Sequence, residues 1–65
     1  MDADDIAAVD ALLDAAALAG WRAEWHPLTA PSRGWRVVLL RPGMPGLAAF
    51  GATLPLAVSD LLLRV

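Results

Sequence analysis

Apolar residues recur at helical spacing near both ends of the sequence and alternate with polar residues in the middle, and this change of period constrains the fold most. Helical spacing covers residues 4–19 and returns after Thr53. Strand spacing covers residues 21–26, 35–41 and 47–52. The order helix, strand, strand, strand, helix predicts one two-layer α+β domain over residues 1–65, with an antiparallel three-stranded sheet.

The first helix is marked at both ends. Asp2, Asp4 and Asp5 cluster where free N–H groups and the positive end of the helix dipole favour carboxylates. Gly20 follows the last periodic residue, where a left-handed glycine commonly ends a helix. The side chains expected to face inward are Ile6, Val9, Leu12, Leu13, Ala16 and Ala17.

The next two strands form a predicted hairpin, joined by the connection PLTAPSRG at residues 27–34. Trp21, Ala23 and Trp25 alternate with polar residues and are expected to lie under the helices, together with Trp35. Pairing Trp25 with Trp35 would place Glu24 opposite Arg36. Residues 35–41 are apolar on both faces, which places that strand in the centre and the first strand at an edge.

The second half begins with a predicted tight turn over residues 42–46, where two prolines and two glycines occur. Thr53 is the expected N-cap of the second helix, with Pro55 in its first turn. The inward stripe of that helix is predicted to comprise Leu54, Ala57, Val58, Leu61, Leu62 and Val65.

A chain of 65 residues has a small core, which supplies only about 3–5 kcal/mol of stability. It has no cysteine and one histidine, so neither a disulfide nor a histidine-rich metal site can reinforce it. Leu56 and Leu63, separated by Ser59 and Asp60, fall opposite the inward stripe of the second helix. We therefore expect a homodimer through this face, with another protein binding the second helix or the edge strand as the alternative.

No arrangement of residues indicates catalysis, and no cofactor or metal ion is expected. Asp10 and Asp14 share a helix face without a third ligand, which is typical of a solvated surface. Five arginines face seven acidic residues and lysine is absent, so the charge balance argues against a nucleic-acid partner. The alternative is a local basic patch on the hairpin, made by Arg22, Arg33 and Arg36.

Membrane insertion and targeting have no support in the sequence. No run approaches the roughly 18 apolar residues of a membrane span, and the start MDADD is acidic where a signal or transit peptide would be basic. A cytoplasmic location is the resulting expectation.

Two short motifs carry a family resemblance. The sequence GWRV at residues 34–37, followed by A-x-x-x-A-T-L-P-L-A-V-x-x-L-L at residues 48–62, resembles small phage and prophage proteins described as α/β/α sandwich domains. Members of that family have a strand containing tryptophan and a helix that begins T-x-P-x-A. The resemblance implies a small accessory protein of phage type and extends over nearly the whole chain.

A second resemblance is to the partial ribonuclease-H-like domain of HicB-type antitoxins, over about twenty residues. Its pattern, P-x-x-P-G and then G-x-T-x-x-x-A at a helix start, matches Pro42, Pro45, Gly46, Gly51, Thr53 and Ala57. The resemblance implies an antitoxin function as an alternative to the phage accessory role.

Overall fold

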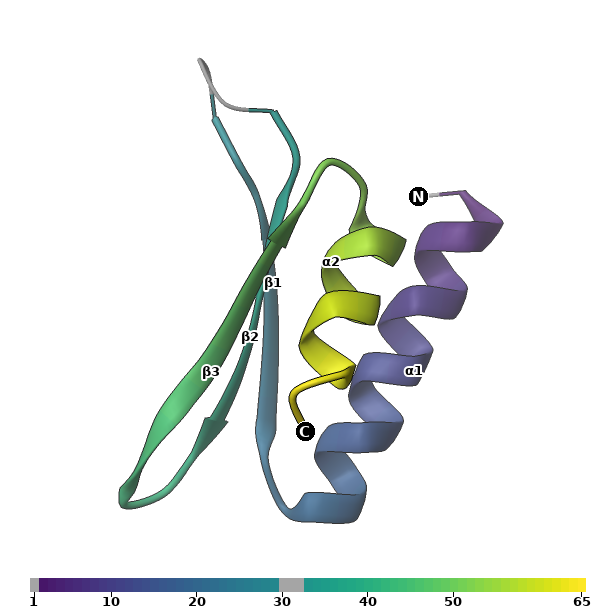
Figure 1. Ribbon diagram of the computed structural model, residues 1–65. Coiled ribbons are helices and arrows are strands. Elements are labelled where there is room, and N and C mark those ends of the chain that lie inside the picture. The colour runs from purple at the N-terminus through teal and green to yellow at the C-terminus, as the bar shows by residue number, and fades with distance from the viewer. Residues whose placement is uncertain (1, 30–32) are drawn as a thin grey trace.

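A computed structural model describes residues 2–29 and 33–65. The order of elements is α1 (Ala3–Ala19), β1 (Arg22–Pro27), β2 (Trp35–Arg41), β3 (Met44–Gly51) and α2 (Leu54–Leu62). The sheet is antiparallel with the order β1-β2-β3, so β2 is central and β1 is an edge strand. Both helices lie on one face of it (Figure 1). The predicted α+β fold and element order are confirmed.

Helix α1 begins and ends where its end signals predict. The Asp2 side chain accepts a hydrogen bond from the backbone N–H of Asp5 at 2.9 Å, which satisfies one of the free donors of the first turn. Gly20 has φ of 70°, a left-handed conformation that residues with a Cβ adopt only at a cost. The chain can therefore reverse directly into β1.

The face that α1 buries differs from the predicted stripe. Ala8, Val9, Leu12 and Ala16 are buried, whereas Ile6, Leu13 and Ala17 are exposed. The physical reason is the neighbour: α1 packs along α2 as well as over the sheet, and two helices approach closely only where small side chains such as Ala8 lie between them. The stripe is therefore rotated toward the alanines.

The hairpin of β1 and β2 has a register two residues away from the predicted one. Trp25 pairs with Val37 and Glu24 with Val38, while Trp35 lies between Pro27 and Gly51. This arrangement gives the bulky Trp35 side chain small neighbours on both strands instead of a second indole. The predicted pairs Trp25 with Trp35 and Glu24 with Arg36 are wrong. Residues 30–32 of the predicted connection lie outside the described residues.

The second hairpin is tighter than expected, because the turn consists of Pro42 and Gly43 alone. Gly43 has φ of 72°, and proline followed by such a glycine is the composition of a type II turn. Strand β3 starts at Met44, three residues before the predicted position. It includes Pro45, which is tolerated because β3 is an edge strand.

Helix α2 starts as predicted, since the Thr53 hydroxyl accepts a hydrogen bond from the backbone N–H of Leu56 at 3.3 Å. Four residues of its predicted stripe are buried, and Leu62 is half-buried. Val65 is exposed, because the helix ends at Leu62 and the last residues turn away from the helical path.

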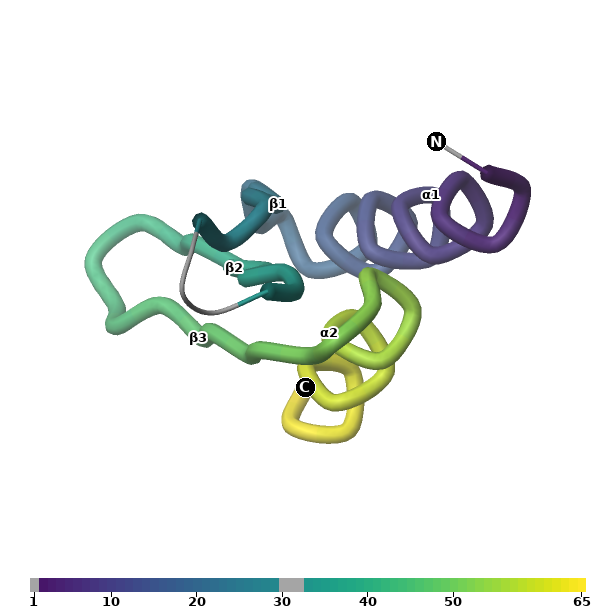
Figure 2. The backbone as a smooth tube through the Cα atoms, turned by 90° about the horizontal axis from the view of Figure 1, so that it is seen from above, coloured from purple at the N-terminus to yellow at the C-terminus, as the bar shows by residue number. Residues whose placement is uncertain are grey.

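The core lies between the helices and the middle of the sheet. Its sheet side is formed by Val37, Leu39 and Ala49, which are almost fully buried. The three tryptophans surround this centre: each is partly buried and packs against it, which agrees with their predicted place under the helices. The two helices do not extend over the outer parts of the sheet (Figure 2).

Candidate functional site

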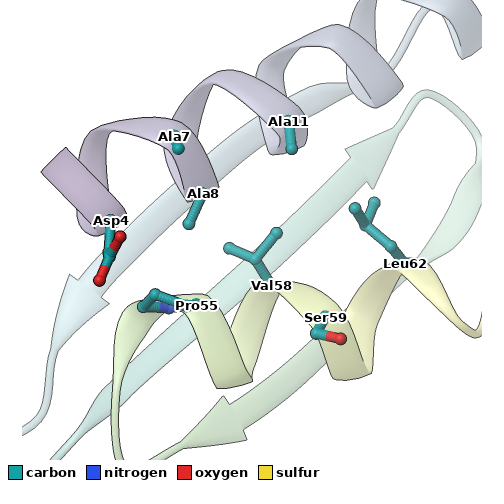
Figure 3. A pocket seen from close by; sticks show the side chains of 8 residues that line it. All are labelled: Asp4, Ala7, Ala8, Ala11, Pro55, Val58, Ser59 and Leu62. Atoms are coloured by element: carbon teal, nitrogen blue, oxygen red, sulfur yellow. The ribbon is translucent and has the colours of Figure 1, made fainter.

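A groove runs between the two helices on the side of the molecule that faces away from the sheet. Its volume is about 440 Å³. Its walls come from matching turns of two helices that run side by side in the same direction (Figure 3). The lining residues are Asp4, Ala7, Ala8, Ala11, Pro55, Val58, Ser59 and Leu62.

The groove exists because α1 has alanines where it passes α2. Ala7 and Ala11 are one helical turn apart, so both present only a methyl group on the same side of α1. The α2 wall of the groove has larger side chains than the α1 wall, since it includes Val58 and Leu62. Six of the eight lining residues have apolar side chains, and Asp4 lies at one end of the groove (Figure 3). An apolar surface of this shape suits packing against another apolar chain.

The predicted interaction residues of α2 lie beside this groove. Leu56 and Leu63 are 59% and 83% exposed, and Ser59, which is one turn from each of them, lines the groove. Together they form a ridge along the outer wall. The two leucines and the groove therefore make one continuous apolar surface, which we call the helix-layer surface.

Asp60 has a different environment from the leucines. Its carboxylate pairs with the Arg64 guanidinium at 2.9 Å, and Arg64 also donates to the carbonyl oxygen of Ala48 at 2.9 Å. The pair connects the end of α2 to strand β3. Asp60 thus helps to hold the helix on the sheet.

The other face of the sheet has no helix over it among the described residues (Figure 1). Alternation along the strands brings these side chains to that face: Arg22, Glu24, His26, Arg36, Val38, Leu40, Ala48 and Phe50. Arg36 is opposite both His26 and Phe50, whose side chain is exposed. Of the predicted basic patch, Arg22 and Arg36 share this face, whereas Arg33 precedes β2 in the connection.

Glu24 is the electrostatic centre of the β1 part of this face. Its carboxylate contacts the Nε2 atom of His26 at 3.2 Å and the guanidinium of Arg22 at 3.0 Å. The hydrogen bond with His26, followed by the charge of Arg22, holds the pKa of Glu24 below its ordinary value. Glu24 therefore neutralises part of the positive charge on this face.

Arg41 lies at the end of β2, with its guanidinium over the ring of Trp21 at 4.5 Å from the centroid. Its Nε atom is buried without a hydrogen-bond partner in the structure. This stacking holds Trp21 against the sheet where α1 leads into β1.

Within residues 2–29 and 33–65, no group of three or more histidine or acidic side chains is placed to hold a metal ion. Nor does any helix in this part of the chain combine the length and apolar character needed to cross a membrane.

No family model, curated protein or solved structure matches the chain. The geometry alone describes the candidate site, which consists of an apolar groove with exposed leucines beside it and an uncovered face of the sheet. Sequence reasoning predicted the exposed position of Leu56 and Leu63 but did not predict the groove. The reason is that it placed Ile6 and Leu13, rather than the alanines, on the inward face of α1. The available signal was the alanine spacing at positions 7, 8 and 11.

Proposed function

We propose that this chain is a non-catalytic interaction module that self-associates through its helix-layer surface. The observation that carries the proposal is the position of a leucine ridge directly beside an apolar groove. A surface with a ridge and an adjacent groove is complementary to its own copy, because a two-fold axis places each ridge over the groove of the other chain.

The energetics favour covering this surface. Leu56 and Leu63 are more than half exposed, and burying both contributes about 2–4 kcal/mol per protomer as an upper estimate. The whole core supplies only about 3–5 kcal/mol. Association would therefore add a substantial fraction of the stability of the folded chain.

Sedimentation equilibrium tests this proposal. We expect the wild type to associate at micromolar concentrations, and the double variant Leu56→Asp with Leu63→Asp to lose that association step. Met44→Asp is the matched control, because Met44 is 56% exposed but lies at the far end of the sheet. The same mass for the wild type and the double variant at every concentration would refute helix-layer association.

The biological setting that we propose is an accessory protein of phage or prophage type, with a HicB-like antitoxin function as the alternative. The support for the setting is the resemblance of residues 34–37 and 48–62 to the phage family. The resemblance to the antitoxins concerns the turn at Pro42 and the start of α2 at Thr53.

A second candidate function is binding of single-stranded nucleic acid on the uncovered face of the sheet. The observation in its favour is that Arg36 and the exposed Phe50 are cross-strand neighbours there, which combines a phosphate contact with a stacking surface. A fluorescence titration with single-stranded oligonucleotides tests it. Binding must weaken steeply with added salt and be lost in Arg36→Ala.

A further inference from the structure

The free edge of β1 is the second unpartnered feature of the molecule, and it is separate from the helix-layer surface. In the part of the chain that the structure describes, no segment lies beyond β1 on its outer side (Figure 2). The opposite edge differs, because the carbonyl of Ala48 in β3 already accepts from Arg64. An exposed edge strand carries unpaired N–H and C=O groups that can pair with another strand.

The backbone of β1 shows which groups are free. Leu28 donates its N–H to the carbonyl of Gly34 at 2.9 Å, and this pair continues the register of Pro27 with Trp35. Hydrogen-bonded pairs alternate along antiparallel strands, so the even-numbered residues of β1 direct their backbone groups toward β2. Ala23 and Trp25 therefore direct their N–H and C=O groups toward the free edge.

We infer that a second copy of this chain pairs with β1 in antiparallel fashion, which joins two three-stranded sheets into one of six strands. A two-fold axis at Ala23 lets the two Ala23 residues exchange hydrogen bonds. It also lets the N–H of Trp25 donate to the carbonyl of the partner's Trp21. The N–H of Trp21 is not needed, since it donates to Ala16 within its own chain at 2.8 Å.

Side-chain charge selects this register among those that the backbone allows. With the axis at Ala23, Arg22 faces the partner's Glu24 and Glu24 faces the partner's Arg22, so opposite charges meet twice. An axis at Glu24 would bring two carboxylates together. An axis at Trp25 would pair Ala23 with the partner's Pro27, which has no N–H to donate.

Helix α1 gives independent support for the same partner. Ala8 points toward α2 (Figure 3), and Ile6 and Leu13 lie about 140–160° around the helix axis from it, so they face away from α2. They are 51% and 43% exposed. Because α1 lies on the β1 side of the helix layer (Figure 2), these side chains lie toward the free edge. Edge pairing brings the two α1 helices together across the axis and covers them.

The experiment uses charge exchange in the background Leu56→Asp with Leu63→Asp, so that helix-layer association does not contribute. Sedimentation equilibrium should show a dimer in this background. Arg22→Glu alone or Glu24→Arg alone should each raise the dimer dissociation constant roughly tenfold, because like charges then meet across the axis. Mixing these two single variants should restore a dimer that contains one chain of each, since every cross-strand pair is then opposite in charge.

A backbone variant gives a second measurement. Ala23→Pro removes an N–H that points away from β2, so the hairpin keeps its internal hydrogen bonds while edge pairing is blocked. In the background Leu56→Asp with Leu63→Asp, we expect the Ala23→Pro variant to be a folded monomer by circular dichroism and sedimentation. In the unblocked background, hydrogen exchange at Ala23 and Trp25 should slow as concentration rises. A monomeric background at high micromolar concentration overturns edge pairing, and a dimer indifferent to both charge changes overturns the register.

Discussion

Gly51, the last residue of β3, packs directly against the backbone of helix α2, and its replacement by alanine should strongly destabilise the fold. A Cβ atom at this position would lie 2.5 Å from the backbone nitrogen of Ala57 and 2.9 Å from its Cα. Ordinary contacts of a Cβ are 3.4–4 Å. The obstacle is helix backbone, so it cannot be relieved by turning a side chain, and α2 must move away from the sheet.

That movement disturbs the core directly, because Leu54, Val58 and Leu61 of α2 are fixed against the sheet. Overpacking of this kind costs about 1–3 kcal/mol and occasionally more, and the rigidity of both partners places Gly51→Ala near 3 kcal/mol. A domain with about 3–5 kcal/mol of stability would then be partly unfolded at 25 °C.

Gly20→Ala is the matched control for this prediction. Nothing lies within 4 Å of a Cβ at Gly20, so the cost there is only that of a left-handed backbone, about 1–2 kcal/mol. Urea unfolding followed by circular dichroism, at equal chain concentration, compares the two variants. If Gly51→Ala loses no more free energy of unfolding than Gly20→Ala, the close packing of α2 on β3 is wrong.

Two further predictions concern polar contacts. Thr53→Ala should lower the free energy of unfolding by about 1 kcal/mol, because the N–H of Leu56 loses its acceptor, whereas Thr53→Ser should be nearly neutral in thermal unfolding. The lowered pKa of Glu24 stabilises the fold above the pKa that glutamate has in the unfolded chain, and this contribution disappears as the pH falls through the folded value. The stability difference between wild type and Glu24→Gln should therefore shrink between pH 6 and pH 3, and a difference that is constant over this range would contradict the assignment.

The elements were predictable from sequence because their signals are local. Asp2, Gly20 and Thr53 act on backbone groups within a few residues, and these contacts are the same whatever the helices pack against. The exposed position of Leu56 and Leu63 was predictable for a similar reason, since the stripe of a nine-residue helix against a sheet leaves one clear outer side.

The details that failed depend on contacts between distant residues. The inward face of α1 depends on how closely α2 approaches. Alanines are buried on that face, whereas the larger apolar residues Ile6 and Leu13 are exposed. The hairpin register is set by the space around Trp35, which includes Gly51 from a third strand. A pattern within one segment carries no information about the segments that pack against it. Hydrophobic spacing therefore predicts where helices and strands lie, but not which helix face is buried or how the strands are aligned.

The two proposed surfaces lie on different sides of α1, and this decides what they can build together. The groove contains Ala7 and Ala11, while the edge interface contains Ile6 and Leu13. Ala11 and Leu13 lie on roughly opposite sides of the helix axis. One chain can therefore occupy both interfaces at once. Each proposed interface has its own two-fold axis. If the two axes cross at right angles, four chains form a closed tetramer, and any other arrangement of the axes does not close at four chains.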